Sequence, residues 1–511
     1  MGWQSTFKIY RPFFVRLATI ASIPGPSFEL CRLTLYGCYM RQTHNTPQNP
    51  VRLIAVSNRT AVDPNARAGG LAVALWDSLK STNGLWVGWS GKVKDFPSLT
   101  PTKVTDDGVD FALCDMSKPQ YEGFYLNYAN SILWPLFHNR LDLVNFDLHN
   151  FAPYQETNRQ FAKAVEDNAN SEDFIWVHDY HFFLIAHELR KNGWTGEIGF
   201  FLHIPFPAPD VFRALPEAAL MGRALCDYDI IGLQTSTDVI NLKRYLVEDC
   251  GGKEVGEEDV LVFGRTVTLR HCPIGIDAKN FRKAALGKPA KKAAKKLRRF
   301  LGGRKQIIGV DRMDYSKGLP QRFEAVSKLF DHFPETRGVT SFMQIAPPSR
   351  SIVDEYVQLR ERLDGLCGRI NGDYGDLDWI PIRYLARPYE RAEIAGLYAM
   401  SDVCLVTPLQ DGMNLVAKEF IAAQDESDPG VLILSQFAGA AEQMKEALIV
   451  NPYDTEAVAQ TLHKALNMPL EERQARWKAL HKTVDTQDIN WWRNRFFAPR
   501  GFTQSVPKIA T

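Results

Sequence analysis

The sequence predicts an α/β protein made of two doubly wound halves, each a parallel sheet with helices on both faces. Two observations indicate this fold. Short apolar runs rich in β-branched and aromatic residues alternate with helical patterns, which is typical of parallel strands joined by crossover helices. The alternation stops after CPIGIDAKNF, residues 272–281, and starts again at QIIGVDR, residues 306–312.

The first half begins with VRLIAVS, residues 51–57, a continuous apolar run of strand length. It ends in the loop NRTAVDPNARAGG, and the helical pattern LAVALWDSLK follows. The same order of strand, polar loop and helix repeats through three more predicted strands: FIWVHD (174–179), IGFFLHI (198–204) and DIIGLQT (229–235).

The second half starts at QIIGVDR and contains five further predicted strands: TSFMQIA (340–346), WIPIRYL (379–385), DVCLVTP (402–408), GVLILS (430–435) and ALIVNP (447–452). Near the end, DINWWRNRFF (488–497) predicts an aromatic helix packed onto the body of the protein. We therefore expect four segments: an N-terminal extension (1–50), a first half (51–281), a second half (282–485) and a C-terminal helix (486–511).

Composition excludes several classes of protein. Sixty Lys and Arg residues face 59 Asp and Glu, and this balance argues against a dedicated nucleic-acid binder. Eight cysteines without a CxxC motif give neither a disulfide framework nor a zinc knuckle, which favours a reducing, cytoplasmic compartment. No apolar run reaches the ~18 residues of a membrane span.

The first fifty residues differ from the rest. They hold five basic residues, one acid and the apolar stretch FFVRLATIASI (13–23), a pattern that resembles a signal or transit peptide. Arg16 interrupts the apolar stretch, so we favour a functional chain that begins at Met40, with residues 1–39 dispensable. The intact mass of the natively expressed protein tests this expectation.

Four local patterns have a plain structural interpretation beside a functional one. The segment 282–305, with eleven Lys and Arg and no acid, is expected to be a solvated helix because it lacks the interleaved aromatic residues of a nucleic-acid site. The spacing of His178, His181 and His187 does not favour zinc. Asp227-Tyr-Asp229 precedes a buried strand and predicts a turn, and the sequon at Asn58 lies on a predicted ligand loop.

Chemically rich loops follow several predicted strands, where ligands of α/β proteins bind. They carry Arg59, Gly69 and Gly70; Asp179 and His181; His203; Arg312, Asp314 and Lys317; Arg350; and Asp411 to Asn414 with Glu419. Arg312 and Lys317 suit a diphosphate, since they pair a bidentate fork with a point charge. Together with carboxylates and a glycine loop, they suggest a nucleotide-sugar site between the two halves.

Ten motifs in order carry a resemblance to a known family: VSNR (56–59), AGGL (68–71), GLWVGWSG (84–91), LWPLFH (133–138), WVHDYH (176–181), FFLHIPFP (200–207), VDRMDYSKGLPQR (310–322), QIAPPSR (344–350), GRINGDYG (368–375) and DGMNLVAKE (411–419). The chain resembles the trehalose-6-phosphate synthases, retaining glycosyltransferases of family 20, from about Arg52 to the tail. The resemblance implies the GT-B architecture: two Rossmann-like domains facing each other across a cleft, with a last helix that crosses back to the first domain.

The resemblance implies a role for each matching residue. The acceptor, glucose 6-phosphate, is expected at Arg59, Trp89, Tyr125, Trp134, Asp179 and Arg350. The donor, UDP-glucose, is expected at Gly70, His203, Arg312, Lys317, Asp411, Gly412, Met413, Asn414, Leu415 and Glu419. Catalysis is expected to depend on Asp179, His203, Arg312, Lys317 and Asp411, without a metal or a cofactor.

The expected reaction is transfer with retention by front-face attack, with Asp179 and Asp411 positioning hydroxyls and not acting as nucleophiles. Two alternatives stay open: a related synthase with another acceptor, such as glucosylglycerol-phosphate synthase or a pseudo-glycosyltransferase, and a non-catalytic sugar-phosphate-binding regulator. Small-molecule substrates are expected as partners, with no nucleic acid or membrane. The resemblance also suggests a homotetramer, and a separate phosphatase because the sequence holds no DxDx[TV] motif.

Overall fold

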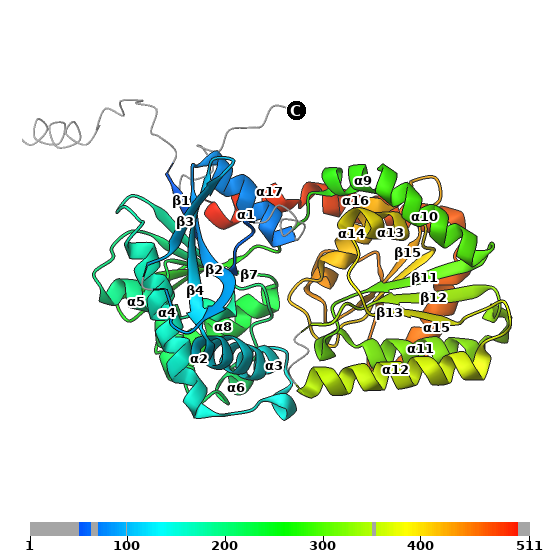
Figure 1. The fold of residues 1–511 in the computed structure, drawn as a ribbon, viewed down its shortest axis with the longest axis horizontal. Coiled ribbons are helices and arrows are strands. Elements are labelled where there is room, and N and C mark those ends of the chain that lie inside the picture. Colours follow the sequence, from blue (N-terminus) through cyan, green and yellow to red (C-terminus); the bar gives the residue numbers. More distant parts are fainter. Residues whose placement is uncertain (1–50, 63–69, 99, 350–353, 499–511) are drawn as a thin grey trace, which may run out of the picture. The chain divides into compact units, whose positions relative to one another are not determined.

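The computed structural model describes residues 51–62, 70–98, 100–349 and 354–498 (Figure 1). The expectations for residues 1–50 and for Arg350 concern parts of the chain outside these ranges. All described residues belong to one unit, Pro50–Thr511. The boundary expected between residues 281 and 282 stays a prediction.

The first sheet has ten strands in the order β3-β4-β2-β1-β5-β6-β7-β10-β9-β8. Its central strands are parallel, and β1 lies between β2 and β5. The chain therefore reverses direction across the sheet between β1 and β5, which is where an open α/β sheet forms its binding crevice. The strands are β1 (Leu53–Arg59), β2 (Leu85–Lys94), β3 (Thr102–Asp106), β4 (Val109–Ser117), β5 (Phe174–His178), β6 (Ile198–Phe201), β7 (Ile230–Leu233), β8 (Lys253–Glu254), β9 (Asp259–Val262) and β10 (Arg265–His271).

The second sheet has six strands, and every pairing in it is parallel. The order is β13-β12-β11-β14-β15-β16, the doubly wound order of a nucleotide-binding fold, with its switch point between β11 and β14. The strands are β11 (Lys305–Val310), β12 (Thr340–Ile345), β13 (Ile382–Leu385), β14 (Val403–Val406), β15 (Val431–Ser435) and β16 (Leu448–Val450). The two doubly wound halves predicted from the sequence are confirmed.

Helices cover both faces of the second sheet: α9, α10, α13 and α14 lie on one side, and α11, α12 and α15 on the other (Figure 1). The helices of the first half are α1 (Gly70–Ser81), α2 (Lys118–Gln120), α3 (Trp134–Phe137), α4 (Phe151–Glu166), α5 (Ile185–Lys191), α6 (Pro209–Phe212), α7 (Ala218–Leu225) and α8 (Ser236–Glu248). Those that follow are α9 (Ala278–Ala285), α10 (Lys288–Leu301), α11 (Leu319–His332), α12 (Asp354–Tyr374), α13 (Arg391–Tyr398), α14 (Leu415–Ala423), α15 (Thr455–Leu466), α16 (Leu470–Thr486) and α17 (Ile489–Phe497).

Two hairpins at the edges of the first sheet have no counterpart in the predicted alternation. Strand β3 pairs antiparallel with β4, and β9 pairs antiparallel with both β8 and β10. The β3–β4 turn places Asp107 and Gly108 at φ of 45° and 81°, and the β9–β10 turn places Phe263 and Gly264 at 48° and 76°. Positive φ at both central residues is the geometry of a type I′ turn, whose twist matches that of the flanking strands.

The basic segment is helical, as predicted from its pattern. Helix α10 (Lys288–Leu301) packs against α13 and buries Ala290, Leu297 and Leu301, while its lysines and arginines are exposed. No helix within the described ranges is both long enough and apolar enough to span a membrane.

Helix α17 packs its aromatic face on the first sheet. The ring of Trp492 stacks on Trp176 of β5 with centroids 5.1 Å apart, and the ring of Phe496 lies 4.7 Å from Trp176. Two glycines make room for Phe496. A Cβ at Gly199 of β6 would lie 2.8 Å from its ring, and one at Gly232 of β7 would lie 2.7 Å from it. The last helix therefore completes the hydrophobic core of the first half.

Candidate active site

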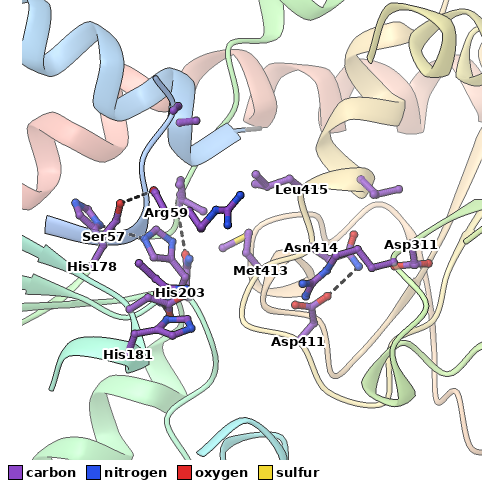
Figure 2. Close-up of a pocket in the computed structure, with 18 of the residues that line it drawn as sticks. Ser57, Arg59, His178, His181, His203, Asp311, Asp411, Met413, Asn414 and Leu415 are labelled. Atoms are coloured by element: carbon purple, nitrogen blue, oxygen red, sulfur yellow. Dashed lines mark hydrogen bonds between the residues drawn. The ribbon is translucent and has the colours of Figure 1, made fainter. Parts of the chain in front are cut away.

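A cavity of about 780 Å³ lies where the strands of both sheets end. One wall comes from the loops after β1, β5 and β6, and the other from the loops after β11 and β14 (Figure 2). These loops include both switch points, so the site lies where doubly wound sheets place their ligands.

The first wall presents Arg59 at the carboxyl end of β1. Its guanidinium carbon lies 4.7 Å from the ring centroid of Trp89 and passes close to Gly91, where a Cβ would lie 2.9 Å from the Nη1 atom. Tyr125 lies 5.8 Å from Trp89 and stacks on His181 at 6.0 Å, both between ring centroids. The result is a positive charge backed by aromatic faces, suited to a phosphorylated sugar.

Tyr125 belongs to an unusual element. Residues Tyr121–Leu133 form a π-helix that leads directly into α3 and Trp134. Segments of this kind are frequent at functional sites. Trp134 faces the opposite wall, where the guanidinium carbon of Arg312 lies 5.4 Å from its ring centroid.

Asp179 and His203 lie next to each other at the ends of the neighbouring strands β5 and β6. The Oδ1 atom of Asp179 accepts a hydrogen bond from the backbone N–H of His203 at 3.3 Å. Asp179 has φ of 75°, a region that costs a non-glycine residue energy and is found mostly at functional sites. Burial lowers the pKa of His203 to about 3, so the ring is neutral at physiological pH.

The opposite wall carries the predicted cation pair. Lys317 ends a short 3₁₀ turn after β11 and forms an ion pair of 2.5 Å with Asp411. The same carboxylate accepts a hydrogen bond from Asn414 Nδ2 at 3.0 Å. Arg312 is half exposed, and its nearest carboxylate is Asp314 at 3.8 Å. Its guanidinium can therefore turn toward a ligand, whereas Lys317 is held in place.

Helix α14 points its N-terminus at the cavity. Its N-cap residue, Asn414, has φ of 73°, and its side chain makes no capping hydrogen bond, since it binds Asp411. The first backbone N–H groups of the helix are thus left for an anion, which the helix dipole also favours. Glu419 lies about one turn further and pairs with Arg391 at 3.6 Å. Burial raises the pKa of Glu419 to about 7, although Arg391 opposes this.

A buried ion pair between Arg322 and Asp311 supports the loop that forms the second wall. Arg322 of α11 is 1% exposed and donates to Asp311 at 2.7 Å, to Thr407 at 3.0 Å and to Gln344 at 2.9 Å. Burial raises the pKa of Asp311, and Arg322 opposes this shift. Because Asp311 directly precedes Arg312, the pair fixes the start of the loop that carries both predicted diphosphate ligands.

The two walls touch through Gly412. A Cβ on this residue would collide with the backbone carbonyl of His203, so only glycine allows this contact. The sequence model of glycosyltransferase family 20 matches residues 42–499. The chain belongs to glycosyltransferase family 20.

Relatives of this glycosyltransferase match over nearly their whole length. A trehalose-6-phosphate synthase from Cronobacter sakazakii is 44% identical over 449 residues, 87% of this chain and 94% of the relative. The solved α,α-trehalose-phosphate synthase (UDP-forming) from Burkholderia xenovorans in complex with glucose 6-phosphate has a TM-score of 0.84 at 42% identity, covering 88% of this chain and 99% of that one. A solved E. coli structure bound with UDP-2-fluoro glucose has a TM-score of 0.85 at 42% identity, covering 89% and 100%.

Most of the predicted site residues of this glycosyltransferase line the cavity: Arg59, Asp179, His203, Arg312, Lys317, Asp411, Met413, Asn414, Leu415 and Glu419. Trp89 lies against Arg59, Tyr125 stacks on His181, and Trp134 faces Arg312, but these three aromatic residues do not line the cavity themselves. Gly70 is the first residue of α1, and Gly412 lies against His203. Arg350 lies outside the described residues. The roles assigned to these residues stay predictions.

Among the polar residues at the cavity that were not predicted to be ligands are His178, Gln234 and Asp311. Each lies at or just after the end of a strand, and His178 and Asp311 also lie within the motifs WVHDYH and VDRMDYSKGLPQR. His181 also lines the cavity, whereas His187 pairs with Asp227, away from it. Within the described ranges, no three His, Cys, Asp or Glu residues are arranged to hold a metal ion.

Proposed function

We propose that this glycosyltransferase transfers glucose, with retention at the anomeric carbon, from UDP-glucose to glucose 6-phosphate and forms α,α-trehalose 6-phosphate and UDP. The observation that carries the proposal is the cavity itself. On one wall lies Arg59, a cation that can bind a phosphate and is packed on aromatic rings. On the other wall lie Arg312 and Lys317, and the switch points of the two sheets lie at these two walls. Relatives solved with glucose 6-phosphate and with UDP-2-fluoro glucose support the same pair of ligands.

On the donor side, Arg312 and Lys317 neutralise the diphosphate as it leaves. The N-terminus of α14 adds backbone donors, and Glu419 accepts hydrogen bonds from the ribose. The donor's glucose contacts His203, Asp411, Gly70 and the backbone from Gly412 to Leu415. These groups are held before the substrate arrives, and fixed dipoles and charges of this kind stabilise a transition state without the cost of reorganisation.

On the acceptor side, Arg59, Tyr125, Trp134 and Arg350 bind the phosphate of glucose 6-phosphate. Trp89 covers an apolar face of the sugar, and Asp179 accepts from its hydroxyls. Because the two sugars meet beside Asp179 and His203, the acceptor hydroxyl attacks from the face that the diphosphate leaves. An oxygen of the leaving phosphate takes its proton.

Asp411 is poorly suited to be a nucleophile, because its carboxylate already binds Lys317 and Asn414. Likewise, the Oδ1 atom of Asp179 already accepts a hydrogen bond from the backbone N–H of His203. We expect no covalent glucosyl-enzyme. Intact-mass spectrometry after incubation with UDP-2-fluoro glucose should show the unmodified chain mass, and a stable fluoroglucosyl adduct on either aspartate would contradict front-face attack.

Arg59→Gln is expected to raise the KM for glucose 6-phosphate by about 10- to 100-fold, because a charge-assisted contact to the phosphate is lost. The KM for UDP-glucose should change little. Initial rates with each substrate varied in turn measure both constants. Arg52→Gln is the matched control, since Arg52 directly precedes the same strand, at the end opposite Arg59, and pairs with Asp110 and Asp173. Equal increases in both KM values would exclude an acceptor-specific role for Arg59.

The raised pKa of Glu419 predicts a pH dependence of donor binding. Below about pH 7, the carboxyl group takes up a proton and loses acceptor capacity, so the KM for UDP-glucose should rise as the pH falls. Glu419→Gln, which cannot titrate, should have a higher KM that is independent of pH. Kinetics at saturating glucose 6-phosphate test this, and a Glu419→Gln variant with the wild-type KM for UDP-glucose at every pH would show that Glu419 does not accept from the ribose.

One assay tests the function as a whole. The purified protein is offered UDP-, ADP- or GDP-glucose together with glucose 6-phosphate or glycerol 3-phosphate, and the phosphorylated product is identified. Turnover with glycerol 3-phosphate alone would indicate the related synthase, and binding without turnover would indicate a regulator. The Lys317–Asp411 ion pair holds the lysine charge in a fixed position, and this favours an enzyme over a non-catalytic regulator. A separate phosphatase, a homotetramer and the absence of a cofactor stay predictions.

A further inference from the structure

We propose that His178 is a positioning residue that fixes the tautomer of His203, so that His203 presents an N–H, and not a lone pair, to the cavity. The inference deepens the proposed function. It rests on that function only where it says which sugar hydroxyl this N–H binds. His178 has no role in the predicted site. It ends β5, and its neighbour Asp179 is already placed at the acceptor.

The geometry joins the two rings at one atom of each. Strands β5 and β6 are parallel neighbours, with His178 opposite Phe201, so that His203 follows two residues beyond the register partner. His178 Nδ1 lies 3.2 Å from His203 Nε2, and the ring centroids are 5.4 Å apart (Figure 2). Asp179, the residue after β5, accepts from the backbone N–H of His203, so the two successive residues His178 and Asp179 contact both the ring and the main chain of His203.

A hydrogen bond between the two rings requires one proton between the two facing nitrogens. Burial lowers the pKa of both imidazoles, so each ring is neutral and carries a single N–H. Two arrangements are possible. Either His178 donates through Nδ1 and His203 accepts at Nε2, or the direction is reversed.

The surroundings of His178 decide between them. Its other nitrogen, Nε2, is buried and has no hydrogen-bond partner among the described residues. In the reversed arrangement this nitrogen would carry the proton, leaving a buried N–H unsatisfied, which is rare and costly in proteins. The proton of His178 therefore lies on Nδ1 and is donated to His203.

The consequence reaches the cavity. With Nε2 of His203 occupied as an acceptor, its single proton lies on Nδ1, which makes no hydrogen bond with any residue in the described ranges. His203 is then a fixed donor to an oxygen of the donor's glucose. It cannot serve as a general base through Nδ1, which leaves the acceptor's proton to the leaving phosphate.

Nitrogen-15 NMR of the histidine-labelled, ligand-free protein reads the tautomer directly. We expect a protonated Nδ1 and an unprotonated Nε2 for His203, identified by the signals lost in His203→Asn. His138 is an internal reference, because its Nδ1 lies 2.7 Å from the carbonyl oxygen of Trp134, which can only accept. A protonated Nε2 in His203, or a mixture of tautomers, would overturn the proposal. Neither result depends on which sugars the protein uses.

Two variants of similar size separate positioning from packing. His178→Asn retains a donor near the position of Nδ1, whereas His178→Leu has none. In the leucine variant we expect His203 to populate both tautomers and kcat to fall about tenfold, with the KM for glucose 6-phosphate little changed. In the asparagine variant we expect His203 to keep the Nδ1-protonated tautomer and the enzyme to keep most of its turnover. Equal losses in both folded variants, with the His203 signals unchanged, would show that His178 only packs. Absence of turnover in the wild type would end the proposed function and leave the tautomer assignment intact.

Discussion

Replacing Lys317 with methionine is expected to lower kcat by about three orders of magnitude with both substrates saturating. The lysine is held at 2.5 Å from Asp411 and is 10% exposed, so its charge is fixed where the diphosphate departs. Removing it takes away stabilisation that exists only as negative charge develops, which affects turnover more than binding. Steady-state kinetics with both substrates varied give the two effects separately.

The same substitution also leaves Asp411 without its ion-pair partner, and a second variant controls for this. Adding Asp411→Asn to Lys317→Met removes the unpaired carboxylate and should restore thermal stability while turnover stays low. If the double variant recovered turnover as well, the effect of Lys317 would be structural, and its role at the leaving group would be wrong.

Arg322→Met is expected to lower the free energy of unfolding by about 3–5 kcal/mol, the largest effect on stability foreseen for a single substitution here. Arg322 has no exposed side-chain surface, and its loss leaves Asp311 buried and uncompensated. Urea unfolding followed by tryptophan fluorescence measures the change. Adding Asp311→Asn should recover part of it, because no unpaired charge then remains in the core.

Lys163→Met is the matched control, because it removes the positive charge of an ion pair on the protein surface. Its partner is Asp167, four residues along the same helix, and both side chains are largely exposed. Little change in stability is expected there, since exposed pairs contribute little. Arg322→Met should also reduce turnover, because its Nη2 atom donates to the carbonyl oxygen of Lys317. A loss of stability no greater than that of Lys163→Met would show that the buried pair is not needed.

Sequence patterns were sufficient for the elements that are buried on both faces. The runs at 51–57, 174–179 and 306–312 contain the continuous apolar stretches LIAV, FIWV and IIGV, and each became a central strand. The hairpins β3–β4 and β9–β10 were not predicted because the first strand of each, β3 and β9, is short and partly exposed, although Asp107-Gly108 is a recognised turn pair. The π-helix has no periodicity that distinguishes it in advance.

The site shows the same division between local and long-range information. Arg312, Lys317 and Asp411 could be predicted because each lies in a recognisable motif after a strand. Arg322 lies in the same motif as Lys317, yet its pairing with Asp311 and Thr407 depends on how three elements meet in space. The contact between His178 and His203 joins residues 25 positions apart, and nothing in either motif reveals it.

The packing of α17 has a consequence for biosynthesis. Trp492 and Phe496 fill the core of a sheet whose own strands end at His271, more than two hundred residues earlier in the chain. Domains emerging from the ribosome usually fold in the order of their synthesis. Here the first half lacks part of its core until α17 has been made, after the whole of the second half, so Trp176 and the glycine slot beside it stay uncovered on the nascent chain until then. Of the helices in the described ranges, the one made last therefore completes the core of the half that is made first.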